Sequence, residues 1–336
     1  MDVGHDLPSV HRPSEEIYSQ TDEILRAWLR DVGFDLQQPI RPFPTKLYAE
    51  LEEWVISQNL QEQQLAGIWK LLSTCTSAAD KWYPHATNQV KRYIALYTTF
   101  LLYVDDRAER DLENVLPDLK RVSSAAYSGL RDLKCDDSVI NLWSELVATE
   151  TGKLYGPYAT GVITKGFVDY ILGNIVETSF AAALNLPAKF GQRASKFVRD
   201  KTGAGEAYAH FIFPEHLAEE SKHLPTYVPF VACILDVIDD VNDVLSFFKE
   251  SVVGNEMNTN IMNRARTSSC SPHDVLKQIG EEVAETISVV SAGLAGKGIA
   301  ETLWKDFING YIMWHICDDR YRLKEIGLVM GPREDQ

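Results

Sequence analysis

Three acidic side chains follow an apolar stretch of the chain and lie within five residues of one another. The segment LLYVDDRAERD, residues 101–111, contains Asp105, Asp106 and Glu109 directly after a run of apolar and aromatic residues. Asp105 and Glu109 are spaced i, i+4, which places them about 40° apart on an α-helix. Like charges on one helix wall repel one another, so this grouping is favoured where a cation lies between the carboxylates. The motif indicates a metal site, although a helix that ends in solvent with a charged last turn would have the same short pattern.

A second group of oxygen ligands lies in NDVLSFFKE, residues 242–250. Asn242, Ser246 and Glu250 are spaced i, i+4, i+8 and would form a stripe about 80° wide on one helix. Amide, hydroxyl and carboxylate oxygens suit a hard cation such as Mg²⁺, which fills its remaining positions with water and phosphate oxygens. Lys249 adds a positive charge at the end of the stripe. The alternative is an amphipathic helix in water, but the apolar stretch before the motif favours an enclosed pocket with a polar mouth.

Helices must position both motifs, because helical periodicity dominates the chain and no convincing series of strand-like runs occurs. Gly254–Ser271 is polar and is predicted to be a mobile loop after a long helix. We predict one all-α domain over residues 16–330, preceded by a flexible arm of residues 1–15. The predicted helices are Ser19–Val32, Leu47–Asn59, Glu62–Thr74, Asn88–Arg107, Asp137–Thr151, Gly161–Leu184, Thr226–Lys249, Ser271–Ala292 and Ala300–Glu325.

Composition limits the classes of protein to which the chain can belong. Its 336 residues are 45% hydrophobic and 24% charged, as in a globular protein with a substantial core. The formal net charge of −15 argues against nucleic-acid binding, which needs a basic patch. The five cysteines are widely spaced with no CxxC pair, so neither a disulfide framework nor a structural zinc site is expected. The polar, acidic start does not resemble a signal peptide and no apolar stretch is long enough to span a bilayer, so a cytosolic protein is predicted.

The two motifs together resemble the aspartate-rich and NSE motifs of class I terpene synthases, in particular those of the fungal trichodiene-synthase-like sesquiterpene cyclases. Arg199, in RDKTG, lies 43 residues before Asn242, at about the place of the family's diphosphate-sensing arginine. Arg320 and Tyr321, in DDRYR, match the family's basic Arg-Tyr signature. These motifs follow the family's order over residues 105–321, which is most of the chain.

The resemblance implies an enzyme that ionises farnesyl diphosphate with the help of three Mg²⁺ ions and cyclises the carbocation to a sesquiterpene hydrocarbon or alcohol. It also implies a helical bundle around a central apolar cavity, and a homodimer. The implied metal ligands are Asp105, Asp106, Glu109, Asn242, Ser246 and Glu250, and the implied diphosphate-binding residues are Arg199, Lys249, Arg320 and Tyr321. In the family the first aspartate tends to be the direct metal ligand, so Asp105 is the residue of this motif that we most expect to bind metal. The third acid of the motif is Glu109 here, where the family has an aspartate.

Two features near these motifs allow more than one interpretation. Asp239 lies one turn before Asn242 and could be an additional outer ligand, or a capped or solvated acid, which is the interpretation we favour. Gly203 would break the helix that carries Arg199. Diphosphate binding at Arg199 could then move the backbone at this break and close the site. A plain C-cap glycine would have the same sequence.

Other functions stay open at this level. A related cyclase could use geranyl or geranylgeranyl diphosphate, because the motifs do not set the chain length of the substrate. A chain-elongating prenyltransferase is disfavoured, because that class has two DDxxD-like motifs. A non-catalytic helical protein that binds diphosphate is disfavoured by the complete set of motif residues. The segment DVIDD, residues 236–240, lacks the DxDD spacing, which argues against cyclisation started by protonation.

Overall fold

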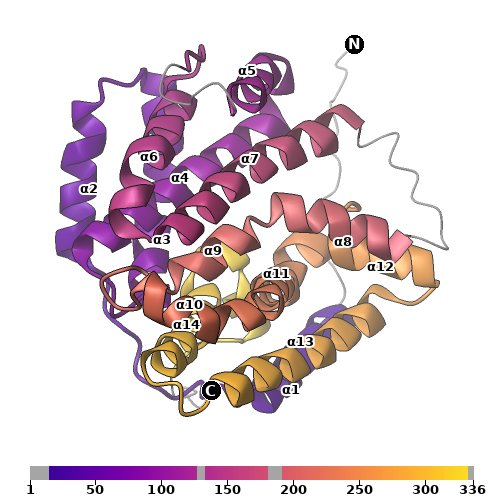
Figure 1. Cartoon of the computed structure of the whole chain (residues 1–336). Helices are drawn as coiled ribbons and strands as arrows, with labels where there is room; N and C mark the ends of the chain where they lie inside the picture. Colours follow the sequence, from indigo (N-terminus) through magenta and orange to yellow (C-terminus); the bar gives the residue numbers. More distant parts are fainter. Residues whose placement is uncertain (1–14, 127–132, 181–190, 332–336) are drawn as a thin grey trace, which may run out of the picture.

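A computed structural model of the chain describes residues 15–126, 133–180 and 191–331. Every regular element in these ranges is helical, which confirms the predicted all-α class (Figure 1). The predicted arm, residues 1–15, lies outside the described residues except for Glu15, the first residue of a helix. The α-helices are α1 (Glu15–Asp31), α2 (Thr45–Ser57), α3 (Glu62–Trp82), α4 (Asn88–Arg110), α5 (Leu112–Ala125), α6 (Ser138–Leu154), α7 (Pro157–Phe180), α8 (Gly191–Thr202), α9 (Gly205–Phe211), α10 (Glu220–Tyr227), α11 (Val231–Phe247), α12 (Asn260–Ser268), α13 (Pro272–Leu294) and α14 (Ile299–Cys317).

Helix α4 carries the first acidic motif and is enclosed by other helices. The Thr87 hydroxyl caps its N-terminus by accepting a hydrogen bond from the Val90 amide. Its residues are apolar on most faces, and it packs against α3, α6 and α5, with further contacts to α2 and α7. Most residues between Val90 and Val104 are buried, which accounts for the run of apolar and aromatic side chains in this part of the helix.

Helix α11 carries the second motif and lies between α9 and α13 (Figure 1). It starts after the 3₁₀ turn η2 (Val228–Phe230), which contains Pro229, and continues without a break into the π-helix η3 (Phe248–Val253). A π-helical turn within a longer helix is uncommon and occurs mostly at functional sites. The last part of NDVLSFFKE therefore lies on a wider helical turn than the α-helix predicted from its sequence.

A buried group of aromatic rings joins α3, α9 and α14, and we call it the aromatic cluster. Trp82 is at its centre, with ring centroids 5.7 Å from Tyr208, 4.9 Å from Tyr311 and 4.9 Å from Trp314. All three pairs meet edge to face, which is a favourable arrangement of aromatic quadrupoles. The cluster ties the C-terminal helix to the middle of the chain and supports the segment that follows it.

Several predicted element boundaries are wrong. The segment Gly254–Ser271, predicted as a loop, contains α12, because Thr259 caps a helix that buries Ile261 and Ala265. The predicted helix Ala300–Glu325 ends at Cys317 and is followed by the 3₁₀ turns η4 (Asp319–Tyr321) and η5 (Leu323–Ile326).

No helix in the described ranges is both long enough and apolar enough to cross a membrane.

Candidate active site

The first acidic motif lies on the last turns of α4. Asp105 faces inward, and the Tyr170 hydroxyl of α7 donates a hydrogen bond to its Oδ1 atom at 3.3 Å. Burial, together with the negative charges of Glu109 and Asp106, raises the pKa of Asp105 to about 6, despite the opposing effect of Arg320. A cation next to the Asp105 carboxylate would therefore stabilise its ionised form.

The other two acids of this motif have different surroundings from Asp105. Asp106 Oδ2 is 3.5 Å from Arg110 Nη2, and its Oδ1 is 4.0 Å from Arg320 Nη2. Glu109 is exposed. In the part of the chain that the structure describes, no three His, Cys, Asp or Glu side chains converge to hold an ion. Within the motif, Asp105 thus contacts α7 and Asp106 reaches the C-terminal segment.

The amide of Asn242 is held between three neighbours. Its Oδ1 accepts a hydrogen bond from Arg199 Nη2 at 3.1 Å. Its Nδ2 lies 3.2 Å from His315 Nε2 and 3.4 Å from the Tyr321 hydroxyl oxygen. These contacts orient the amide so that its oxygen faces Arg199 and its nitrogen faces α14 and η4.

His315 determines that orientation, and sequence reasoning gave it no role. It is fully buried, and burial lowers its pKa to about 3, so the ring is neutral near pH 7. Its Nδ1 lies 2.8 Å from the Tyr311 carbonyl oxygen. A carbonyl can only accept, so Nδ1 carries the proton and Nε2 is the acceptor for the Asn242 amide. An isolated histidine on an apolar helix has no motif that would have revealed this contact.

The remaining residues of the second motif differ in their surroundings. Ser246 is buried. Among the described residues, no donor or acceptor meets the distance and angle limits of a hydrogen bond with its hydroxyl oxygen. Glu250 lies in the π-helical turn, where burial raises its pKa to about 7 and Lys249 opposes that rise. Lys249 Nζ is 3.5 Å from Glu250 Oε1.

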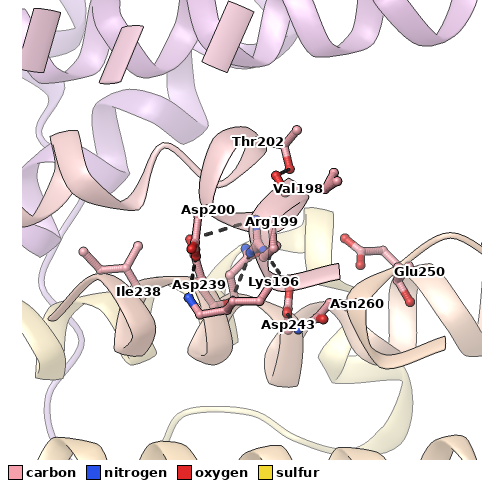
Figure 2. Close-up of polar contacts among 12 residues, drawn as sticks. Lys196, Val198, Arg199, Asp200, Thr202, Ile238, Asp239, Asp243, Glu250 and Asn260 are labelled. Atoms are coloured by element: carbon pink, nitrogen blue, oxygen red, sulfur yellow. Dashed lines mark hydrogen bonds and ion pairs between the residues drawn. The ribbon is translucent and has the colours of Figure 1, made fainter. Parts of the chain in front are cut away.

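Arg199 projects from the end of α8 onto α11 (Figure 2). Its Nε donates to Asp243 Oδ1 at 2.9 Å, and its Nη2 donates to the Asp239 carbonyl oxygen at 3.0 Å. The charges of Asp243 and Asp239 raise the pKa of the guanidinium further above its usual range, although burial opposes this. The arginine is thus charged, and within the described ranges its side-chain hydrogen bonds and ion pairs are with residues of α11.

The C-terminal segment connects the two motifs. Tyr321 is buried beneath Trp314 and His315, with ring centroids at 5.3 Å and 4.5 Å. Its hydroxyl faces the Asn242 amide, while the neighbouring Arg320 reaches Asp106. A chain of contacts therefore runs from the first motif through η4 to the second motif and on to α8.

The donor set fits Mg²⁺. Its atoms are carboxylate, amide and hydroxyl oxygens, which hard cations prefer. Ser246 supplies a buried hydroxyl, and Asp105 and Glu250 supply partly buried carboxylates. The amide oxygen of Asn242 accepts one hydrogen bond, from Arg199, and has a second lone pair.

Solved structures of terpene synthases have a similar arrangement of helices. The linalool/nerolidol synthase of Streptomyces clavuligerus has a TM-score of 0.61 and 15% sequence identity, over 84% of this chain and 99% of that chain. The same synthase superposes in its complex with 2-fluorogeranyl diphosphate with a TM-score of 0.59. The fold is thus that of class I terpene synthases.

Sequence comparison defines the family. The family model of trichodiene synthase (TRI5) matches residues 74–334, and the chain belongs to this family. It is 25% identical to the (E)-beta farnesene synthase of Metarhizium brunneum over 92% of this chain and 90% of that protein. It is 24% identical to the longiborneol synthase of Gibberella zeae over 97% of this chain and 93% of that protein. The chain is accordingly an enzyme of the terpene synthase class, lyases that act on prenyl diphosphates.

Proposed function

We propose that the protein is a Mg²⁺-dependent sesquiterpene synthase that ionises farnesyl diphosphate, cyclises the carbocation and releases diphosphate. One observation carries this proposal. Residues from four distant parts of the sequence form one connected set, in which Asp106 is next to Arg320, and Asn242 contacts both Tyr321 and Arg199. Such a set brings acids for metal and cations for diphosphate to the same place.

Four residues are proposed to hold the diphosphate: Arg199, Lys249, Arg320 and Tyr321. The arginines remain charged at any working pH, and their planar forks match phosphate oxygens. The buried Tyr321 hydroxyl keeps its proton because burial raises its pKa, so it can donate to an anion. Fixed donors around the departing group stabilise the negative charge that develops there.

The proposed metal-binding residues are those of the two motifs: Asp105, Asp106, Glu109, Asn242, Ser246 and Glu250. Asp105 and Glu250 are partly buried acids with raised pKa values, and a cation would stabilise their ionised form. When bound, Mg²⁺ supplies positive charge that stabilises the diphosphate as it departs. Asp106 has a second proposed role, because its contact with Arg320 positions that cation beside the first motif.

The hydrocarbon part of the substrate needs dry, apolar surroundings, because water would quench the carbocation. The aromatic cluster is in contact with Tyr321, because Trp314 of the cluster packs against the Tyr321 ring. Aromatic faces attract positive charge, so these rings are suited to stabilise a carbocation that moves away from the diphosphate.

The chain length of the substrate is tested directly. The two curated relatives above are named as makers of farnesene and longiborneol, which supports a C15 substrate. Purified protein is mixed with geranyl, farnesyl or geranylgeranyl diphosphate, each with Mg²⁺ and with EDTA. The organic extract is analysed by gas chromatography–mass spectrometry. A Mg²⁺-dependent C15 product from farnesyl diphosphate alone supports the proposal.

Preferred conversion of geranyl or geranylgeranyl diphosphate would replace the proposed substrate with a shorter or a longer one. No product from any of the three substrates would favour a non-catalytic diphosphate-binding protein. The mass of a C15 product would also tell a hydrocarbon from an alcohol. A cytosolic location and a homodimer stay predictions.

A further inference from the structure

Asp239 is a fully buried carboxylate with no hydrogen bond to either oxygen within the described ranges. The side chain lies on α11, one turn before Asn242, and is 1% exposed. The interpretation as a capped or solvated acid is therefore wrong. An ionised carboxylate in this position is costly unless a cation compensates it.

The cation that faces Asp239 is Arg199 (Figure 2). Arg199 Nη1 lies 4.0 Å from Asp239 Oδ1, and Arg199 Nη2 donates to the carbonyl oxygen of the same residue. Lys196, one turn earlier on α8, is engaged elsewhere, since its Nζ is 2.6 Å from Asp236 Oδ1 and also pairs with Asp200.

Asp243, the other acid that contacts Arg199, differs in one respect. Asp243 Oδ1 accepts from Arg199 Nε, while its Oδ2 accepts from Asn260 Nδ2 at 2.8 Å. Asp243 would therefore keep a hydrogen bond if Arg199 moved. Asp239 would be left buried without a countercharge in contact, so it adds a cost to the departure of Arg199 beyond the loss of the shorter contact with Asp243.

Asp239 also lies against the break between α8 and α9. An ideal Cβ at Gly203 would be 2.1 Å from Asp239 Oδ1, and one at Gly205 would be 3.0 Å from the same atom. Ala204 between them has a left-handed backbone, with φ of 51°. The backbone of the break is therefore in direct contact with the carboxylate, and α9, which begins there, carries Tyr208 of the aromatic cluster.

From these contacts we propose that Asp239 is a positioning residue, the resident counter-ion of Arg199, which diphosphate must displace when it binds. This inference rests on the proposed function, because it takes Arg199 as a diphosphate ligand. In the free enzyme Asp239 holds the guanidinium on α11. When the diphosphate takes Arg199, the carboxylate loses its cation and the break packed against it readjusts. Asp239 thereby couples diphosphate binding to the position of α9, which carries Tyr208 of the aromatic cluster.

The test is a double-mutant cycle on the binding of inorganic pyrophosphate in the presence of Mg²⁺, measured by isothermal titration calorimetry. Asp239→Asn keeps the volume and removes the charge that competes for Arg199. We expect it to tighten pyrophosphate binding about tenfold, within the usual range of coupling between sites. In an Arg199→Gln background the same substitution should have no effect, because no arginine remains to be released. Unchanged or weaker binding by Asp239→Asn overturns the inference.

The matched control is Asp236→Asn, on the same helix face. Its carboxylate is 42% exposed and pairs with Lys196 instead of Arg199, so pyrophosphate affinity should not change. An equal gain in both variants would show a general effect of negative charge on α11 and would overturn the inference. If the wild-type protein itself does not bind Mg²⁺-pyrophosphate, the proposed function fails first. Binding that is normal, dependent on Arg199 and unaffected by Asp239→Asn refutes this inference alone.

Stability gives a second readout, which also decides the matter if the single Asp239→Asn variant does not fold. Arg199→Gln should lower the melting temperature by leaving Asp239 uncompensated, and adding Asp239→Asn should recover part of that loss. Adding Asp243→Asn should recover less, because Asp243 keeps its bond from Asn260. Equal recovery in the two double variants, or none with Asp239→Asn, contradicts the special dependence of Asp239 on Arg199.

Discussion

Replacing Gly203 by alanine should destabilise the enzyme, because the break between α8 and α9 has no space for a Cβ. That atom would lie 2.1 Å from Asp239 Oδ1 and 2.9 Å from Arg199 Nη1, whereas an ordinary contact is 3.4–4 Å. The carboxylate would have to retreat by about 1.3 Å, the difference between these distances. Asp239 is buried and cannot swing into solvent, so the backbone of the break or of α11 must shift instead.

The size of the effect follows from the cost of overpacking, about 1–3 kcal/mol. We expect the upper end, about 3 kcal/mol, because the clash involves a buried charged group. An unfolding entropy of about 2.1 cal/mol/K per residue, over the 336 residues of the chain, gives about 0.7 kcal/mol/K. The melting temperature should therefore fall by about 4 °C.

Thermal unfolding followed by circular dichroism measures this change, and Gly161→Ala in α7 is the matched control. A Cβ at Gly161 meets nothing within 4 Å, so alanine should instead stabilise its helix by about 0.5–1 kcal/mol. Adding Asp239→Ala to Gly203→Ala removes the atoms that clash and should recover part of the lost stability. A Gly203→Ala protein that melts at or above the wild-type temperature would refute the packing of Gly203 on Asp239.

Three further predictions concern the site and the pH response. Arg199→Lys should lower kcat by about 100-fold or more while changing the melting temperature little, since one ammonium cannot replace the fork of a guanidinium. Steady-state kinetics measure this, and a variant with full activity would contradict the prediction. Mg²⁺ with pyrophosphate should raise the melting temperature of the wild-type protein. The rise should be clearly smaller for Glu250→Gln, because this variant lacks the negative charge of a proposed metal ligand. An equal rise in both proteins would argue against Glu250 as a metal ligand. Burial lowers the pKa of His210, so the unfolded state binds more protons at this side chain, and His210 should contribute a loss of stability below about pH 6.5 of at most about 1.4 kcal/mol per unit. The buried His315 should add a loss of its own, because its pKa is lowered to about 3. His210→Leu should flatten this part of the curve in urea titrations at several pH values, and an unchanged slope would exclude His210 as its source.

Much of the local structure could be predicted from the sequence because it depends on neighbours along the chain. The periodicity of residues 88–107 indicated a buried helix, and α4 extends it by one turn to Arg110. The spacing of Asn242, Ser246 and Glu250 placed them on one continuous helical segment, which the structure has. The π-helical turn at Glu250 could not be predicted, because it depends on how the end of α11 packs against other elements.

Two features of the candidate site come from tertiary structure alone. His315 lies 73 positions from Asn242, and its buried, neutral ring orients that amide through a contact that no spacing rule encodes. Asp239 belongs to an acidic run whose members look alike in sequence, yet α8 covers it and leaves Asp236 half exposed.

The sequence by itself thus determined the all-helical class and the family, and it predicted which oxygen-bearing side chains form the two motifs, since residue type and short-range spacing carry that information. Only the fold decided which acids are buried, which cation compensates each of them and what the glycines at the break contact. Burial changes the energy of a charge by several kcal/mol, and burial is set by helices that are far apart in the chain.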